Sequence, residues 1–231
     1  MTEDRALSRP LSRRSMLKTG AVASAGIWAA PSILSLDRAA AAVGSCGTAP
    51  RQVDFSRFSG NLPSSFTSDD GAVNITFTQT DNDGVQDPSY DGIIFNGLMN
   101  GLDNPVVNGM SGATGGDQVR WRFDFSEGVC PSFYLVDVDR AEGGSNEFED
   151  TIVVFGRLNG GPRVDPASFQ LGGSQVQVNS RTVRGISSTS TTSGNVLVTF
   201  DQPIDRLIIR HRDVSTLSGF QWIGVHDFHW C

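Results

Sequence analysis

The densest group of acidic side chains in this chain lies between residues 137 and 150. Carboxylates are hard oxygen donors, and Ca²⁺ takes about six to eight such oxygens in proteins. Asp137 and Asp139 end one predicted strand, and Asp150 begins the next. We therefore expect Asp139 and Asp150, together with Asp137, to be calcium ligands. The alternative is an acidic loop that is simply solvated.

The same cluster supports a hydrolase as an alternative. A glycosidase needs two carboxyl groups about 5–10 Å apart across a cleft, and Asp139 and Glu149 are the candidates. The remaining signals favour a protein that is not an enzyme. The sequence has no Gly-x-Ser-x-Gly or His-Glu-x-x-His motif. His226 and His229 would point to opposite faces of a strand and could not readily share a metal.

Aromatic side chains offer a different kind of chemistry. Their ring faces can stack on sugars, although an aromatic residue in an alternating strand more often belongs to the core. The candidates are Trp121, Trp222, Trp230 and Tyr134.

The elements that must position these residues read as β-strands. Short runs of alternating apolar and polar residues are separated by Gly, Asn, Asp and Ser, which is typical of an all-β sandwich or barrel. We expect about ten strands and no amphipathic helix after residue 36. The expected strands are residues 52–58, 72–80, 92–96, 119–125, 132–139, 151–156, 174–179, 195–200, 206–211 and 220–230.

Alternation also predicts which side chains face the core. Trp121, Phe123 and Phe125 share one face of a strand, which leaves Arg120 and Arg122 on the other. Two stretches follow one pattern, an apolar strand, a short turn with an apolar anchor and a second apolar strand. They are residues 119–135 and 196–209, and each is expected to form a hairpin.

Residues 119–231 resemble exported bacterial jelly-roll modules. The resemblance rests on the segments Phe125…Val129…Phe133-Tyr-Leu-Val-Asp-Val-Asp139, Glu149-Asp150-Thr-Ile-Val-Val-Phe155, Phe200-Asp-Gln-Pro-Ile204, Leu207-Ile-Ile209 and Ile223-Gly-Val-His-Asp227-Phe228. It implies a jelly-roll-like antiparallel β-sandwich, similar in outline to carbohydrate-binding and adhesion domains. Such modules often hold a structural ion between the first and last strands, for which Asp54 and Asp227 are the candidates. The implied partner is an extracellular glycan or a surface protein, and a purely structural or adhesive role is the alternative.

The first residues resemble a bacterial twin-arginine (Tat) export signal. Arg13 and Arg14 lie in Ser12-Arg13-Arg14-Ser15-Met16-Leu17-Lys18, before an apolar run that is too short and interrupted to span a membrane. We expect residues 1–42 to be a cleavable signal helix and residues 43–231 one exported domain, periplasmic, cell-surface or extracellular. The membrane would then be contacted only through the signal, unless Cys46 carries a lipid.

Charge excludes some partners. The chain has a net charge of −7, and without residues 1–42 it keeps 12 basic and 22 acidic groups. Such a surface repels nucleic acid and anionic membrane. Three cysteines leave one unpaired in an oxidising compartment. Cys46–Cys231 and Cys130–Cys231 are both open as disulfide pairings.

Overall fold

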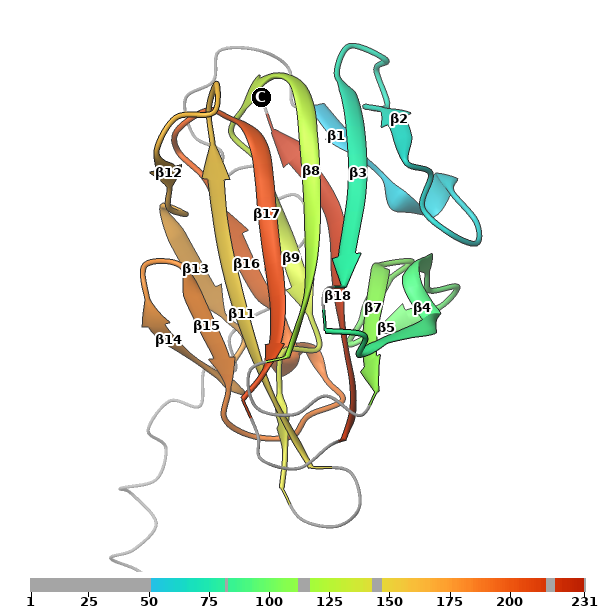
Figure 1. Ribbon diagram of the computed structural model, residues 1–231, viewed down its shortest axis with the longest axis vertical. Coiled ribbons are helices and arrows are strands. Elements are labelled where there is room, and N and C mark those ends of the chain that lie inside the picture. Colours follow the sequence, from blue (N-terminus) through green and yellow to red (C-terminus); the bar gives the residue numbers. More distant parts are fainter. Residues whose placement is uncertain (1–50, 82, 112–116, 143–146, 215–218, 231) are drawn as a thin grey trace, which may run out of the picture. The chain divides into compact units, whose positions relative to one another are not determined.

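Two antiparallel β-sheets pack face to face in the computed structural model, which describes residues 51–81, 83–111, 117–142, 147–214 and 219–230 (Figure 1). The proposed signal segment with Arg13 and Arg14, and also Cys46 and Cys231, lie outside the described residues. The predicted all-β class and sandwich arrangement are confirmed. In the described part of the chain, no helix is long and apolar enough to cross a membrane.

The first sheet has seven strands in the order β13-β16-β9-β18-β7-β4, with β1 also paired to β18. Their bounds are β1 Arg51–Val53, β4 Gln86–Ile94, β7 Val106–Ser111, β9 Ser132–Val136, β13 Ser168–Leu171, β16 Val196–Thr199 and β18 Phe220–Trp230. The last strand of the chain therefore lies in the middle of this sheet.

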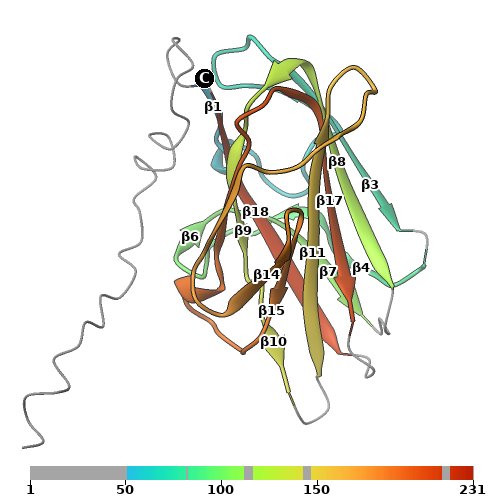
Figure 2. The same ribbon diagram turned by 90° about the vertical axis from the view of Figure 1, so that its left-hand side faces the viewer.

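The second sheet has nine strands in the order β14-β15-β11-β17-β8-β3-β2, with β10 and β12 also paired to β11. Figure 2 shows β11, β17, β8 and β3 side by side in this layer. The bounds are β2 Ser65–Thr67, β3 Asn74–Asp81, β8 Gln118–Val129, β10 Arg140–Ala141, β11 Phe148–Arg157, β12 Arg163–Val164, β14 Gln175–Asn179, β15 Thr182–Gly185 and β17 Ile204–Asp213.

Three small elements complete the described chain. A two-stranded hairpin consists of β5, Leu98–Met99, and β6, Leu102–Asp103. Two 3-10 turns span Phe55–Arg57 and Thr192–Gly194.

The central strands pair in a nested order. Strand β7 pairs with β18, β8 with β17, β9 with β16, and β11 with β15. Among these eight strands, the first along the chain therefore pairs with the last, the second with the seventh, and so on inward. Each of these four pairs is antiparallel, and successive pairs lie alternately in the seven-stranded and nine-stranded sheets. The chain thus folds as one long two-stranded ribbon that wraps around the core.

The core lies between the two sheets. Phe123 of the nine-stranded sheet packs edge-on against Phe228 of the seven-stranded sheet, with ring centroids 4.9 Å apart. Trp121, Phe123 and Phe125 are all buried there, as their alternation predicts. Burying each such side chain stabilises the fold by about 1.5–3 kcal/mol.

The two predicted hairpins are wrong. β8 and β9 lie in different sheets, as do β16 and β17, so both short connections carry the chain across the end of the sandwich. The two connections lie beside each other, because Val129 pairs with Ile204 and the Phe200 amide donates to the Pro131 carbonyl at 3.0 Å. The similar sequences therefore mark two equivalent crossovers, and the apolar anchors Val129 and Ile204 close the core beneath them.

The outer face of the seven-stranded sheet is also partly covered. Strand β9 is buried on both faces. Its outward side chains Tyr134 and Val136 pack in a second apolar cluster with Met99 of the small β5–β6 hairpin. This second apolar cluster forms one wall of the candidate site.

Candidate functional site

Asp137 is held out of the sheet by a backbone turn directly after β9. Its φ of 66° lies in the left-handed region, which Asp tolerates better than most residues. The next amide, that of Val138, donates to the Gly194 carbonyl at 2.9 Å and fixes the turn. Asn100 Nδ2 donates to Asp137 Oδ1 at 2.8 Å. A β-carbon at position 194 would lie 2.5 Å from that same Nδ2, so the close approach requires glycine.

Asp139 is fixed by its backbone and its carboxylate together. Its carbonyl accepts from the Asp150 amide at 3.1 Å, and its Oδ2 accepts from the Thr189 amide at 2.9 Å. A β-carbon at Gly185 would overlap the Asp139 carbonyl, so the strand β15 can approach only without a side chain there. The carboxylate is thus placed by main-chain contacts from two other segments.

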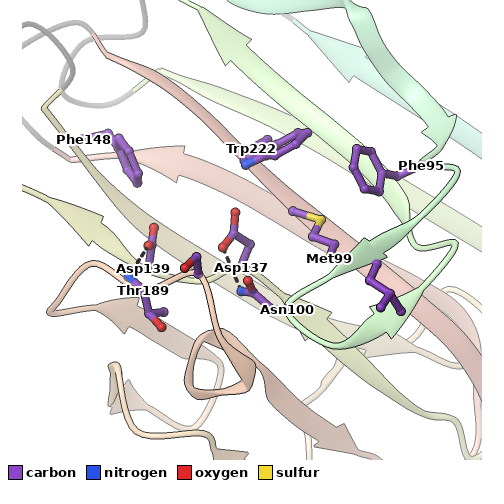
Figure 3. Close-up of a pocket in the computed structure, with 10 residues that line it drawn as sticks. Phe95, Met99, Asn100, Asp137, Asp139, Phe148, Thr189 and Trp222 are labelled. Atoms are coloured by element: carbon purple, nitrogen blue, oxygen red, sulfur yellow. Dashed lines mark hydrogen bonds between the residues drawn. The ribbon is translucent and has the colours of Figure 1, made fainter.

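Asp137 and Asp139 open into a pocket of about 370 Å³ (Figure 3). Three aromatic rings lie along one side of the view, and the two carboxylates with the Asn100 carboxamide lie along the other. The lining residues are Phe95, Leu98, Met99, Asn100, Asp137, Asp139, Phe148, Thr189, Ser190 and Trp222. Such a division into an apolar wall and a few convergent polar groups is usual for small-molecule sites.

Trp222 is the half-buried aromatic residue at the centre of this wall. Its neighbours in β18 point inward, since Ile223 belongs to the main core, and Trp222 therefore stands on the outer face of the seven-stranded sheet. Phe95 meets it edge-on, with ring centroids 5.4 Å apart at 89°. The other three aromatic candidates are different. They are at most 9 % exposed: Trp121 and Trp230 belong to the main core, and Tyr134 belongs to the second apolar cluster.

The pocket carboxyls lie in a low-dielectric environment. Burial raises the pKa of Asp137, and hydrogen bonds from Asn100 and Trp222 oppose this rise. Burial also raises the pKa of Asp139 to about 7, although the Thr189 amide lowers it. The nearby carboxylates of Asp150 and Asp137 add to the rise. Asp139 is therefore partly protonated near neutral pH and can donate as well as accept a hydrogen bond.

Asp150 lies behind the pocket, between the sheets. Its Oδ2 accepts from the Asp139 amide at 3.1 Å, and its Oδ1 lies 2.8 Å from His211 Nε2. Burial raises the pKa of Asp150 and lowers that of His211 to about 3. His211 also approaches Asn108 of the opposite sheet at 3.5 Å. Asp150 therefore supports Asp139 from within rather than facing the pocket.

The predicted calcium ligands are thus brought together but face different spaces. Asp137 and Asp139 line the pocket, and Asp150 turns towards His211. Across the described ranges, no three His, Cys, Asp or Glu side chains are arranged to hold a metal ion.

The alternative catalytic pair of Asp139 and Glu149 is not assembled. Glu149 alternates with the inward Asp150 and lies on the outer face, where it contacts Arg140 at 3.3 Å and Arg184 at 3.5 Å. The carboxyl that shares the pocket with Asp139 is Asp137 instead.

Asp54 and Asp227 do meet where the first and last strands pair. Asp227 Oδ1 accepts from the Phe55 amide at 2.8 Å, and Asp54 Oδ1 accepts from the Ser56 amide at 2.8 Å. Burial raises the pKa of Asp227, with Asp54 adding a smaller repulsion. Both carboxylates therefore hold the backbone turn that follows β1.

His226 and His229 do not point to opposite faces of β18, as strict alternation predicts. A register shift lies between them where β18 pairs with β9. Val225 and Phe228 both belong to the core, so the irregularity places His226 and His229 on the same, outer face. Strict alternation fails because a bulge adds a residue.

Sequence reasoning missed most of the pocket wall. Phe95, Asn100 and Thr189 come from connections between strands, which lack a periodic signal. The Asn100-Gly101 pair could have indicated a tight turn there, but not what the turn faces.

Comparison with protein families, curated proteins and solved structures found no match.

Proposed function

We propose that this chain is an exported, non-catalytic β-sandwich protein that binds a neutral glycan in the pocket beside Trp222. The supporting observation is the pairing of an aromatic wall with two carboxyls and a carboxamide in one cavity of about 370 Å³. Ligand cavities of proteins commonly begin at about 300 Å³. A sugar ring presents apolar C–H faces and polar edges, which match the two sides of this pocket.

The polar side supports the choice of a neutral sugar. Asp137 accepts hydrogen bonds from hydroxyl groups, and Asn100 can both donate and accept. Asp139, with its pKa of about 7, can do both as well. An anionic sugar would be repelled by these carboxyls, whereas a neutral one supplies only hydroxyl groups.

The finer fold assignment belongs to the same proposal. In a jelly roll, a two-stranded ribbon wraps so that strands pair first with last and so on inward. The four nested pairs from β7·β18 to β11·β15 support this assignment. Lectin domains are among the proteins that use this architecture. The twin-arginine motif supports a place of action outside the cytoplasm, at the cell surface or beyond it.

A glycan array followed by calorimetric titration of the exported protein tests the pocket. Trp222→Ala should abolish binding, and Asp137→Asn should weaken it about tenfold, the effect of one hydrogen bond to a charged group. Phe220→Ala is the matched control. Its ring lies on the same strand 6.4 Å from Trp222 and does not line the pocket. An array without hits, or equal loss in the control, would overturn the proposal.

A calcium ion at this site is a separate part of the proposal. The carboxylates of Asp150 and Asp137 raise the pKa of Asp139, and a cation between Asp137 and Asp139 would relieve the repulsion between these two groups. Melting in CaCl₂ and in EGTA tests this idea. An unchanged melting temperature would remove calcium and leave the glycan proposal intact.

One observation favours a hydrolase as the second candidate function. Asp139 has the raised pKa of a general acid and shares the pocket with a second carboxyl, Asp137. If the array identifies a glycan, its incubation with the protein should leave the chain length unchanged. Cleavage that disappears in Asp139→Asn would establish the enzyme instead.

A further inference from the structure

The outer face of the nine-stranded sheet carries a group of arginines in an otherwise acidic protein. Side chains of β8 and β17 alternate between core and surface, and Arg120, Arg210 and Arg212 all point outward. Arg210 pairs directly with Arg120 across the two strands, and Arg212 follows two residues later on the same face. We call these three residues the arginine face.

The arginine face differs in its partners from Arg122, Arg184 and Arg206 of the same sheet. Arg206 Nε and Arg122 Nε each lie 2.6 Å from Asp124, and Arg184 contacts Glu149. By contrast, no carboxylate of the described ranges lies within ion-pair distance of the arginine face. The Nε atoms of its three members, like that of Arg122, are buried and have no hydrogen-bond partner within that part of the chain, but only Arg122 has a carboxylate beside it.

The proximity of these like charges opposes folding, and a bound anion would offset the repulsion. Like charges directly opposite each other in antiparallel strands are destabilising. Burial and the positive charges of Arg120, Arg163 and Arg212 lower the pKa of Arg210.

The arginines are nevertheless held in place from below. Arg210 and Arg163 both lie over the ring of Phe155, with guanidinium carbons 5.5 and 4.8 Å from its centroid. Packing against an aromatic ring limits the conformations that these long side chains can adopt.

We propose that the arginine face binds an acidic polysaccharide whose sugars carry carboxylates. A guanidinium matches a carboxylate with two parallel hydrogen bonds. Residues two apart on a strand are about 7 Å apart, and neighbouring strands about 4.8 Å. The three guanidinium groups therefore form an extended positive surface that meets more than one acid group of a chain at once.

Two observations favour a polysaccharide over a nucleic acid. The net charge of −7 opposes any polyanion, and most strongly one as highly charged as nucleic acid. Single-stranded nucleic acids also use exposed aromatic rings for stacking, and Phe155, on the same face, is only 2 % exposed.

This surface is independent of the pocket. Trp222 stands on the outer face of the seven-stranded sheet, and the arginine face is on the outer face of the nine-stranded sheet. Failure of either binding activity therefore leaves the other untouched, and Trp222→Ala should bind an acidic polymer like the wild type.

Affinity electrophoresis in gels that contain polygalacturonate, with dextran gels as the neutral reference, tests the proposal. Wild-type protein should be retarded by polygalacturonate alone, and the retardation should weaken with added salt. Arg210→Gln should weaken the apparent affinity at least tenfold. Arg181→Gln is the matched control, because it removes the same charge from an arginine that pairs with Asp165.

Arg212→Gln provides a second variant if Arg210→Gln fails to fold, as judged by its melting curve. Absence of retardation by polygalacturonate would overturn the proposal, as would equal loss in Arg181→Gln. Tighter binding to single-stranded DNA than to polygalacturonate would overturn it in favour of a nucleic-acid surface.

Discussion

His211 and Asp150 form a hydrogen-bonded pair inside the sandwich, with Nε2 and Oδ1 2.8 Å apart on the neighbouring strands β17 and β11. Both side chains are almost completely buried. Burial disfavours charge on each of them, so the pair is best described as one unit that holds a shared proton. Asp150 also accepts from the Asp139 amide, and the pair therefore connects the interior to the wall of the pocket.

Removing one partner of this pair should be more damaging than removing both. We expect His211→Leu or Asp150→Leu alone to lower the free energy of unfolding by about 1–3 kcal/mol, because the other polar group is left buried without its hydrogen-bond partner. The double variant should lose less stability than either single variant, because no buried polar group is left without a partner. Urea unfolding of the four proteins measures this coupling. Additive losses would show that the two side chains act separately.

The raised pKa of Asp139 predicts a stability that falls as pH rises. An unfolded Asp titrates near pH 3.9, whereas the folded group titrates at about 7. Between these values the folded state binds the extra proton, so its contribution is complete below about pH 4 and is lost by about pH 7. The expected slope is up to about 1.4 kcal/mol per pH unit.

Asp139→Asn isolates this effect because its side chain stays neutral. The variant should match the wild type near pH 4 and become the more stable protein above pH 7, in urea unfolding with EGTA present. A stability difference that is the same at pH 4.5 and pH 7.5 would show that Asp139 titrates normally.

The pairing of β1 with β18 favours a disulfide between the two ends of the domain. Arg51 lies opposite Trp230; in the sequence, Cys46 precedes Arg51 by five residues and Cys231 directly follows Trp230. Cys130 is a free thiol whose pKa is raised by burial and by Asp201. Non-reducing peptide mapping of the exported protein should find Cys46 linked to Cys231, which would stabilise the fold by about 4 kcal/mol. A Cys130–Cys231 peptide would contradict this pairing.

The twin-arginine motif predicts the route of export. Replacing both Arg13 and Arg14 by Lys should leave most of the precursor uncleaved in the cytoplasm, because the motif is read through these two side chains. Cell fractionation and the mass of the product measure this. Arg9→Lys, outside the motif, is the control and should be exported normally. Unchanged export of the double variant would point to another route.

The sequence was informative where strands are long and regular. β8, β11, β17 and β18 were located closely because their inward and outward residues alternate. β7 was missed because Asn108 points into the sandwich and Gly109 follows it, so the strand has no simple apolar face. The crossovers read as hairpins, because strand order depends on contacts between segments that are far apart in the sequence.

The sequence predicted the acids of the site and one aromatic residue, Trp222. Asp137 and Asp139 were found by the local density of carboxylates, which needs no tertiary information. Their partners Asn100 and Thr189 come from distant connections and meet them only after the sheets assemble. Likewise, Arg120 was correctly placed outward, but its pairing with Arg210 depends on the register of two strands.

The position of β18 has a consequence for the synthesis of the protein. This strand of 11 residues follows β1, β7 and β9 in the chain, yet it pairs with all three in the middle of its sheet. Until it arrives, the seven-stranded sheet consists of separated pieces with exposed strand edges. This sheet therefore cannot close before residues 220–230 have been synthesised, and pairings between such distant segments are slow to form. A nascent chain of this protein spends that interval exposed to chaperones and proteases, and a truncation of β18 would extend it indefinitely.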